Sequence, residues 1–515
     1  MKLLLTKIVA TLGPASAAPE VIGQLIDVGV RVFRLNFSHG TFDDHSQLLA
    51  TVRSMASDSG VPVAVLGDLS GPKIRVGEVV KEGVMLEKGT QVEFVKGTVV
   101  TGSPGTTSPG RVAFSTSYPA IVEEVQEGEP VLLDDGKVRL TCVGKRGRGE
   151  DARLLCEVTH EGPITSRKGV NLPQTTMSLP SLTEKDRACA RFAVENDLDY
   201  VALSFVRSAA DVIALRSLLT ELAQAKQGAE AAPRGGKSLA AGDGLKPLPI
   251  ISKIEKPQAV ADIDAIVDAS DGIMVARGDL GVEMDLAEVP VVQKQIIEHC
   301  HAHGKPVIVA TQMLETMIEA PTPTRAEVSD IANAILDGSD AVMLSGETSV
   351  GKWPLRAAET MSRVAQQTND YLKQKPLVFG SPHEARGAWR QFAMIAEGAW
   401  LMASGLDAKL VVLWGELERA AYLSRRKASR PILLFAEDER QLRRSALLFG
   451  VTAVQLETPA SSEAFLVAAD QLIQERGWAK RGDTVLVMIP TSLSATGAGN
   501  TLMVHRLGDP VGEAA

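Results

Sequence analysis

The order of apolar and polar residues along the chain alternates between two patterns. Short apolar runs rich in Val and Ile, typical of buried strands, are separated by longer stretches with the spacing of amphipathic helices. Strands that alternate with helices predict parallel βαβ units, and eight such units predict a closed (β/α)8, or TIM, barrel. The eight predicted strands are Lys7–Leu12, Val30–Asn36, Val63–Asp68, Tyr200–Phe205, Ile250–Glu255, Gly272–Arg277, Pro306–Thr311 and Ala341–Ser345.

A segment of different character separates the third and fourth predicted strands. From Gly71 to Arg167 the chain is rich in Gly, Val, Thr and Glu, with short alternating runs such as QVEFV and VRLTCV. This pattern predicts an all-β insertion that leaves the barrel at the face where barrel active sites lie. We therefore expect a β-rich lid domain, residues 71–167, on a barrel formed by residues 1–70 and 168–365. A passive insertion is the alternative.

A second α/β pattern follows the barrel and predicts a C-terminal α/β domain, residues 371–515. Within the barrel region, the segment Ala223–Pro249 is dominated by Ala, Gly, Lys and Pro, which predicts a loop on the face opposite the active site. The predicted strands of the C-terminal domain are Lys409–Leu413, Pro431–Phe435, Ala453–Leu456 and Thr484–Met488.

Composition narrows the class of protein. The 515 residues exceed what one hydrophobic core accommodates, and 45% hydrophobic and 23% charged residues are ordinary for a globular protein. The net charge of −9 argues against nucleic acid or an anionic membrane as a partner. No apolar stretch is long enough to span a membrane. The four cysteines lack metal-ligand spacing, and Thr6 and Lys7 interrupt the amino-terminal apolar run. We therefore expect a cytoplasmic protein with reduced thiols and no signal peptide.

Polar residues end six of the predicted barrel strands. A single Asp or Arg at a strand end is more often a cap or an ion pair than a catalyst. Six such ends in one barrel converge on the same mouth, which favours a functional site. These endings are Arg34-Leu-Asn36-Phe-Ser38-His39-Gly40, Asp68, Lys253-Ile-Glu255, Arg277-Gly278-Asp279, Thr311-Gln312 and Ser345-Gly346-Glu347-Thr348.

Two of these endings carry carboxylates on adjacent strands, Glu255 and Asp279. Mg2+ is typically held by one or two carboxylates together with substrate oxygens and waters, so the pair fits that ion. Lys253 lies two residues before Glu255, on the same face of its strand. A cation beside a bound metal indicates an anionic substrate, and Arg34 adds a planar fork suited to phosphate. Positioned cations and a metal ion are the usual devices of phosphoryl transfer.

Longer motifs spread along the whole chain resemble those of the pyruvate kinase family. In that family a barrel is interrupted by a β-rich lid and followed by an α/β domain, which is the organisation expected above. The resemblance implies transfer of a phosphoryl group from phosphoenolpyruvate to ADP in glycolysis. The motifs are KIVATLGPAS, RLNFSHG, GPKIRVG, SRKGVNLP, ISKIE, IMVARGDLG, VIVATQMLE, TRAEVSDIANAILDGSDAVMLSGETSVGKWP and GNTLMVHRLG.

Matching these motifs position by position implies roles for individual residues. Arg34 would hold the phosphate of phosphoenolpyruvate, Lys253 would stabilise the transferring phosphoryl group and the enolate, and Thr311 would lie near the protonated carbon. Gly278 and Asp279 would also contact the substrate, and Glu255 and Asp279 would bind Mg2+, which Mn2+ can replace. The nucleotide-side positions match Asn36, Ser38, His39, Arg75 and Lys168, and a monovalent-cation (K+) site matches Asn36, Ser38, Asp68 and the carbonyl of Leu69.

The resemblance also implies partners. The substrates would be phosphoenolpyruvate and ADP, with pyruvate and ATP as products, and the assembly would be a homotetramer. Enolate protonation at carbon would make the overall reaction effectively irreversible.

Two departures from the family pattern affect these expectations. Members that need K+ generally carry Thr-Lys and Glu where this chain has Leu69-Ser70 and Lys73. We expect the Lys73 ammonium to act as a tethered substitute that makes K+ dispensable. The alternative is that Lys73 points to solvent and pairs with a lid residue, which leaves Asn36, Ser38 and Asp68 free to bind K+. A hydroxyl-rich loop that grips an effector phosphate aligns with Trp414-Gly-Glu416-Leu-Glu418-Arg419, which predicts no activation by fructose 1,6-bisphosphate through that loop.

Two alternatives remain. One, also an enzyme, is another barrel that handles phosphoenolpyruvate or pyruvate, such as an aldolase or a phosphonomutase, which would lack the lid and the nucleotide-side Arg75 and Lys168. The other, from a different class, is a catalytically idle regulatory protein, against which four intact residues argue: Lys253, Glu255, Asp279 and Thr311. An ADP-dependent pyruvate assay separates all three.

Overall fold

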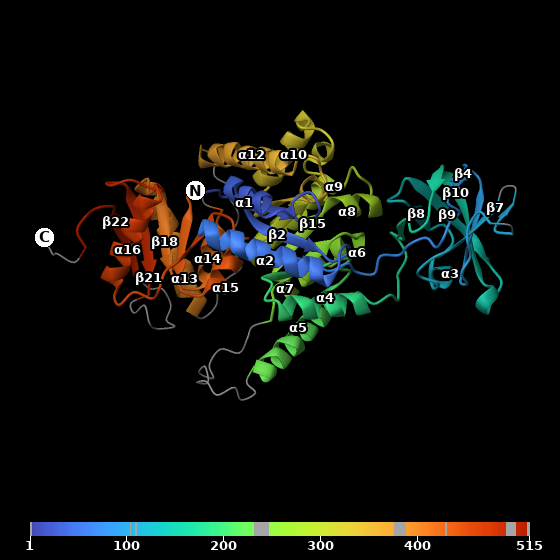
Figure 1. Cartoon of the computed structure of the whole chain (residues 1–515), viewed down its shortest axis with the longest axis horizontal. Helices are drawn as coiled ribbons and strands as arrows, with labels where there is room; N and C mark the ends of the chain where they lie inside the picture. The colour runs from blue at the N-terminus through green and yellow to red at the C-terminus, as the bar shows by residue number, and fades with distance from the viewer. Residues whose placement is uncertain are drawn as a thin grey trace.

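The chain forms three domains that follow one another along its long axis, with the barrel in the middle (Figure 1). The computed structural model describes residues 3–103, 105–108, 111–230, 247–374, 388–427, 430–490 and 501–511. The β-rich lid lies at one end and the C-terminal α/β domain at the other. The fold is the predicted one: a closed parallel barrel, an inserted β domain and a C-terminal α/β sheet.

The barrel closes by pairing its first strand with its last. The strand order is β1-β17-β16-β15-β14-β13-β3-β2, and Lys7 of β1 is in register with Ala341 of β17. Each strand begins or ends within two residues of its prediction. The strands are β1 (Lys7–Thr11), β2 (Val30–Asn36), β3 (Ala64–Asp68), β13 (Tyr200–Leu203), β14 (Ile250–Ile254), β15 (Gly272–Ala276), β16 (Val307–Ala310) and β17 (Ala341–Leu344).

Helices cover the outside of the barrel, and their ends follow local capping chemistry. Three of them begin with a capping box in which a Thr hydroxyl and a carboxylate exchange hydrogen bonds with backbone N–H groups, at Thr41, Thr183 and Thr324. The helices are α1 (Pro19–Val28), α2 (Phe42–Ser59), α4 (Glu184–Glu195), α5 (Ala209–Glu230), α6 (Pro257–Ala261), α7 (Ile263–Ala269), α8 (Arg277–Glu283), α9 (Val289–His303), α10 (Arg325–Leu336), α11 (Gly346–Ser349) and α12 (Pro354–Gln374).

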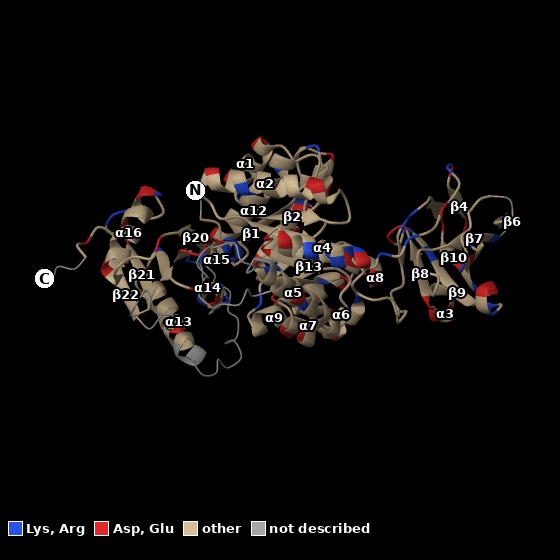
Figure 2. Ribbon diagram, turned by 60° about the horizontal axis from the view of Figure 1, so that its bottom comes forward, with Lys and Arg blue, Asp and Glu red and all other residues tan. Residues whose placement is uncertain are grey.

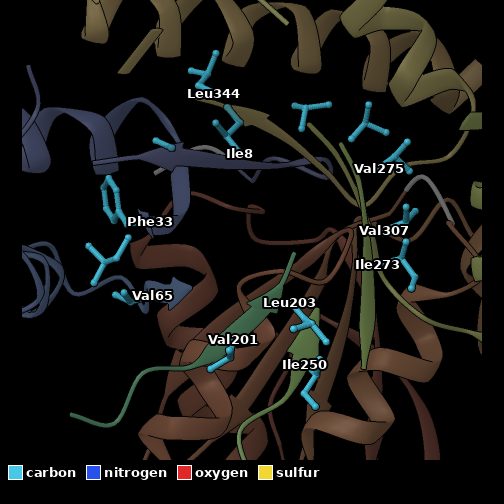
Figure 3. Close-up of a cluster of buried hydrophobic side chains, with 14 of the residues drawn as sticks. Ile8, Phe33, Val65, Val201, Leu203, Ile250, Ile273, Val275, Val307 and Leu344 are labelled. Atoms are coloured by element: carbon cyan, nitrogen blue, oxygen red, sulfur yellow. The ribbon is translucent and has the colours of Figure 1, made fainter. Parts of the chain in front are cut away.

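Successive residues along each barrel strand point alternately into two cores, one outside and one inside the barrel. Ile8, Phe33, Val65 and their neighbours point outward against the helices (Figure 3). Val9, Leu66, Met274 and others point inward, where Ala446 and Leu447 of the C-terminal domain join the same buried cluster. The inner core therefore fills the barrel and includes part of the C-terminal domain, so the active mouth is restricted to the opposite end.

The lid consists of the strands between β3 and α4. Its larger sheet has the order β12-β8-β9-β10-β5-β7-β6 and is joined by the pair β11-β4. Its own buried cluster includes Phe94, Phe114 and Val131, so the lid has a separate hydrophobic core. Its elements are β4 (Val84–Leu86), β5 (Gln91–Val95), β6 (Thr107–Ser108), β7 (Arg111–Ser115), α3 (Ile121–Glu124), β8 (Pro130–Leu133), β9 (Val138–Arg146), β10 (Arg153–His160), β11 (Gly162–Ile164) and β12 (Val170–Asn171).

The C-terminal sheet has one strand more than expected. Its order is β20-β19-β18-β21-β22, and β22 runs antiparallel to β21 at the edge. Buried clusters line both of its faces. Its elements are α13 (Ala388–Gly405), β18 (Leu410–Trp414), α14 (Leu417–Ser424), β19 (Ile432–Ala436), α15 (Glu439–Ser445), β20 (Val451–Gln455), α16 (Ser462–Glu475), β21 (Thr484–Ile489) and β22 (Thr501–Arg506).

Part of the segment Ala223–Pro249 was predicted wrongly. Helix α5 continues through Glu230, so residues 223–230 are helical rather than a loop. Residues 231–246 lie outside the described part of the chain. The helical part is rich in Ala, Gln, Lys and Glu, which are strong helix formers, and the low complexity of the segment concealed that preference.

Charge and hydropathy agree with the composition. Acidic and basic residues are interspersed along the barrel helices (Figure 2). Among the described residues, no helix has the length and apolar character needed to cross a membrane. All four cysteines are buried free thiols, as predicted.

Candidate active site

Four ionisable side chains meet at the carboxyl ends of the barrel strands. Lys253 of β14 lies between Glu255 and Asp68, with its Nζ 2.9 Å from Glu255 Oε1 and 3.4 Å from Asp68 Oδ2. Arg34 of β2 reaches the same Asp68, with Nε 2.6 Å from Oδ2. These four predicted residues therefore form one buried cluster, which isolated caps or surface ion pairs would not produce.

The cluster alternates in charge, and this sets the pKa values of its acids. Burial alone would raise the pKa of Asp68, but the charges of Lys253 and Arg34 outweigh burial and lower it. Burial would lower the pKa of Lys253, but the two carboxylates beside it raise that pKa. Asp68 and Lys253 consequently stay ionised across the physiological range.

Glu255 behaves differently from Asp68. Burial and the charge of Asp279 together raise its pKa, although Lys253 and a hydrogen bond from Phe205 N at 2.7 Å oppose that rise. Two carboxylates, one directly after β14 and one in α8, thus share one site that has less positive charge than they require. Such a pair gains from a divalent cation, and its hard oxygen donors suit Mg2+.

Thr311 occupies a strained turn next to Gly278. Its φ is 68° and that of Gln312 is 56°, both in the left-handed region that side chains with a Cβ rarely adopt. The Thr311 hydroxyl accepts a hydrogen bond from Gly278 N at 2.7 Å and donates to Ala310 O at 2.6 Å. The left-handed turn and these two hydrogen bonds therefore hold the hydroxyl at the strand ends, in contact with the short helix α8 that carries Asp279.

The positions matched to the nucleotide and K+ sites lie beside this cluster. Asn36 Oδ1 accepts a hydrogen bond from Ser38 N at 3.1 Å, and Phe37 N donates to the Asp68 carbonyl at 3.1 Å, so this loop is tied to β3. His39 follows in the same loop, and its carbonyl contacts His45 at 3.0 Å. The Leu69 carbonyl accepts from Ser204 Oγ at 2.6 Å.

Arg75 and Lys168 come from the two chain segments that connect the lid to the barrel. Arg75 donates to the Arg167 carbonyl at 3.0 Å, and Lys168 Nζ lies 2.9 Å from Asp134 Oδ1. The pKa of Asp134 is lowered, because the cations of Lys168 and Lys137 outweigh its partial burial. Both cations are thus held at the root of the lid by contacts within the lid itself.

Lys73 does not lie where its predicted role requires. Its Nζ is 4.0 Å from Asp135 Oδ1 in the lid, and 37% of the side chain is exposed. The expectation that its ammonium sits beside Asp68 is therefore wrong, and the alternative of pairing with a lid residue describes the structure. Arg34 and Lys253 provide the cations next to Asp68 instead.

Sequence reasoning missed Ser204. Its hydroxyl accepts a hydrogen bond from Lys253 Nζ at 2.8 Å and donates to the Leu69 carbonyl, so it links two strand ends of the site. It directly follows β13, and the strand-end rule that selected the other residues would have found it.

Among the described residues, no group of three or more His, Cys, Asp or Glu could hold a metal ion by itself.

Comparison with known proteins gives a consistent result along the chain. The family profile described as pyruvate kinase, barrel domain, matches residues 4–228 and 237–358, and that described as pyruvate kinase, alpha/beta domain, matches residues 393–505. A pyruvate kinase of Agrobacterium vitis is 38% identical over 505 residues, covering 98% of both proteins. One from Corynebacterium glutamicum is 39% identical, again over 98% of each. The crystal structure of a pyruvate kinase from Cryptosporidium parvum superposes with a TM-score of 0.85 at 33% identity, covering 98% of this chain and 96% of the other.

Proposed function

The chain belongs to the pyruvate kinase family, and from this premise we propose that its barrel mouth transfers the phosphoryl group of phosphoenolpyruvate to ADP through the cluster around Lys253. The enzyme is a phosphotransferase of glycolysis that yields pyruvate and ATP. One observation carries the assignment to this site: a buried Lys253 bridges two carboxylates at the strand ends where a phosphoryl group would bind.

Glu255 and Asp279 are the proposed ligands of the divalent ion, Mg2+ or Mn2+. Their donor atoms are carboxylate oxygens, and the raised pKa of Glu255 reflects a site that accepts more positive charge. When bound, the ion would supply positive charge to the phosphoryl and enolate oxygens. Family membership supports the use of a divalent metal in general. The assignment of Glu255 and Asp279 as its ligands is our own proposal.

Arg34 and Lys253 are the proposed phosphate-binding cations. Arg34 presents a planar guanidinium whose Nε is fixed by Asp68 and whose Nη1 lies 3.1 Å from Thr11 Oγ1, so the fork is held in one orientation. Lys253 is anchored by Ser204 and two carboxylates. Cations fixed before the reaction need no reorganisation when charge moves from the phosphoryl group to the enolate.

Thr311 and Gly278 are proposed to act on the product side of the same mouth. The Thr311 hydroxyl proton is directed at the Ala310 carbonyl. For a proton to reach the enolate carbon, this hydroxyl must turn toward it or pass on a proton delivered from solvent. The backbone of Gly278 and Asp279, in the first turn of α8, is proposed to contact the carboxylate end of the substrate.

The nucleotide would bind between the barrel loop and the lid. Asn36, Ser38 and His39 supply the loop after β2, and the cations Arg75 and Lys168 come from the lid root. Two positive charges there suit the phosphates of ADP and ATP. Movement of the lid would therefore change the nucleotide half of the site more than the phosphoenolpyruvate half.

Dispensability of K+ is a separate part of the proposal. The candidate K+ site comprises Asn36, Ser38, Asp68 and the Leu69 carbonyl. Asp68 already contacts two cations, and Lys73 places no carboxylate at the position where K+-requiring relatives have Glu. A further cation ~4 Å from one of these charges is opposed by roughly 4 kcal/mol at an intermediate effective dielectric. The substitution thus removes an anion, rather than inserting a tethered ammonium as the sequence suggested.

Activity in tetramethylammonium buffer free of K+ and Na+ tests the K+ proposal. Full activity is expected, and Lys73→Glu should lose activity there and regain it when K+ is added. A wild-type enzyme that is nearly inactive until K+ is supplied would overturn this proposal.

A cytoplasmic homotetramer completes the proposed biological form. Sedimentation velocity of the purified protein measures the assembly directly, and a stable monomer or dimer would contradict the tetramer.

Production of pyruvate from phosphoenolpyruvate, followed with and without ADP, tests the function itself. Formation that depends on both ADP and Mg2+ is expected. An aldolase-like or phosphonomutase-like barrel would act without ADP, and an idle regulatory protein would form no pyruvate.

A further inference from the structure

A buried polar cluster joins the root of the lid to the two elements that carry the proposed metal ligands. Asn171 Nδ2 donates to Glu283 Oε1 at 2.8 Å, and Lys256 Nζ donates to the same oxygen at 2.9 Å. The side chain of Lys256 is 5% exposed and that of Glu283 is 1% exposed. None of the three belongs to the site described above.

Each barrel member of the cluster is adjacent to one proposed ligand. Lys256 directly follows Glu255 and is the N-cap residue of α6. Glu283 ends α8, one turn after Asp279, and residues four apart share one face of a helix. A displacement of Lys256 or Glu283 is therefore transmitted over a single residue or a single helical turn to the metal-binding carboxylates.

The third member belongs to the lid. Asn171 is the last residue of β12 and pairs with Leu132 of β8, so it moves with the lid sheet. Three residues earlier on the same strand segment is Lys168, and Gly169 forms a bridge with Arg75. The two cations proposed for the nucleotide are thus carried by the segment that Asn171 fastens to α8.

Other contacts show that the second connecting segment is the more firmly attached side of the lid. Gln258 of α6 donates to the Pro173 carbonyl at 3.1 Å, and Arg207 donates to the carbonyls of Met177 and Leu179. The first connecting segment is held by a hydrogen bond from Gly71 N to Asp186 at 3.2 Å. The buried contact of Asn171 with the ion pair of Lys256 and Glu283 lies on this more firmly attached side.

The cluster also retains unused hydrogen-bonding capacity. Within the described residues, Asn171 Oδ1 and Glu283 Oε2 are buried without a hydrogen-bond partner. A cavity of about 20 Å3 beside them is lined by Lys73, Asn171, Lys256 and Glu283 among others, which is room for about one water molecule. A water bound there would be available to pair with these buried oxygens.

We propose that Asn171, Glu283 and Lys256 form the pivot that sets the lid angle relative to the metal-binding carboxylates, and that they are positioning residues for ADP. This inference rests on the proposed function. Without the pivot, Arg75 and Lys168 are no longer held near the nucleotide phosphates. Arg34 and Lys253 keep their contacts with Asp68 in the barrel. The pivot therefore affects ADP and leaves phosphoenolpyruvate binding in place.

Asn171→Ala tests this without changing any charge. The KM for ADP should rise about tenfold or more, since a hydrogen bond to a buried charge contributes a factor of this size, and the KM for phosphoenolpyruvate should stay within about twofold. Asn196→Ala is the matched control, because the Asn196 side chain bonds only locally to the Phe192 carbonyl at 2.9 Å, at the end of α4. The control should change neither KM.

A double-mutant cycle measures the coupling of Asn171 to its partners, and it provides a second test if one variant folds poorly. In Lys256→Met/Glu283→Leu, which leaves no unpaired buried charge and no hydrogen-bond acceptor for Asn171, the KM for ADP should already be raised. Adding Asn171→Ala to this background should raise it by less than about twofold, because the partner of Asn171 has gone. Independent, additive effects would overturn the pivot.

Hydrogen exchange of the free protein gives a readout that needs no activity. The amides of Val76 and Val170 cross-link the two connecting segments through bonds to Lys168 O and Ile74 O, and they should exchange faster in Asn171→Ala but not in Asn196→Ala. Unchanged exchange, or a parallel rise of both KM values, would overturn the inference. Absence of ADP-dependent pyruvate formation in the wild type would instead reject the proposed function.

Discussion

At the residue scale, Lys253 carries the charge balance of the barrel mouth. It contacts Asp68, Glu255 and Ser204 within 3.4 Å. Without it, two buried carboxylates face each other with only Arg34 beside them. The same ammonium that would assist transfer therefore also offsets the repulsion between the carboxylates of Asp68 and Glu255.

Lys253→Met should abolish most phosphoryl transfer. Losing one positioned stabiliser of transition-state charge commonly costs ~10²–10³ in rate, and the pKa of Asp68 should rise because a neighbouring cation has gone. The measurement is kcat for ADP-dependent pyruvate formation, together with a thermal melt to confirm folding. Lys226→Met, on the outer helix α5, is the control and should retain activity. Transfer within a few-fold of wild type would contradict the role of Lys253.

Thr311→Ala should mainly impair protonation of the enolate. Its hydroxyl is the group that the left-handed turn holds against Gly278 N. Exchange of the pyruvate methyl protons with deuterated solvent isolates this half of the reaction. Thr311→Ser, which keeps a hydroxyl, should retain more exchange than the Ala variant. If exchange and the full reaction are both unchanged in Thr311→Ala, the residue has no such role.

At the scale of elements, the sequence was most informative where the residues of a single segment determine its secondary structure. Buried parallel strands are short Val- and Ile-rich runs, so all eight barrel strands were predictable. The edge strand Thr501–Arg506 was missed because it is antiparallel and partly exposed, and its pattern was interpreted only as a family motif. Helix α5 extends through Glu230, into a segment predicted to be a loop. That prediction rested on the low complexity of the segment and overlooked its residues with high helix propensity.

Site residues followed the same rule. Strand ends located Arg34, Lys253 and Glu255, since the topology of a closed barrel brings every carboxyl end together. The sequence offered pairing of Lys73 with a lid residue only as the alternative, and it could not identify Asp135 as the partner, because Asp135 is distant along the chain. The buried cluster around Glu283 was equally invisible, since nothing in the sequence pairs Asn171 with α8.

Helix α9 carries a histidine that makes stability depend on pH. His301 is buried near the C-terminal domain and contacts the Gly338 carbonyl at 2.9 Å. Burial, reinforced by the charge of Lys427 and opposed by that of Asp340, lowers its pKa to about 4. The folded protein therefore binds this proton less readily than the unfolded chain, whose histidine has a pKa near ~6.5.

The free energy of unfolding should consequently fall as the pH drops from about 6.5 toward 4, because the unfolded chain gains the proton first. Denaturant unfolding at a series of pH values measures this slope. His301→Gln should flatten it in that window, whereas His160→Gln, at an exposed lid position, should not. An unchanged slope in His301→Gln would show that other groups dominate.

At the scale of the whole molecule, the lid is an appendage with its own core. Its two connecting segments lie side by side, with Val76 N bonded to Lys168 O at 2.8 Å and Arg167 N bonded to Val76 O at 3.2 Å. The strands β3 and β13 that flank the insertion pair directly within the barrel. Neither the barrel sheet nor its cores depend on lid residues.

A chain in which residues 77–166 are replaced by an Asn-Gly turn should therefore still fold, since that dipeptide favours a tight reversal between paired strands. Circular dichroism should show a cooperative thermal transition, while ADP-dependent transfer falls strongly because the mouth is open to water. A chain that fails to unfold cooperatively would show that the barrel requires its lid.

The pairing of β1 with β17 has a consequence for how the chain is made. A ribosome that adds about 5–20 residues per second finishes the first strand on the order of tens of seconds before the strand that must pair with Lys7–Thr11. Ala446 and Leu447 of the C-terminal domain, which complete the inner core of the barrel, are synthesised later still. Throughout that interval the nascent chain presents unpaired strand edges and an unfilled apolar interior. Production of this protein is therefore expected to depend on factors that shield such surfaces until synthesis is nearly complete.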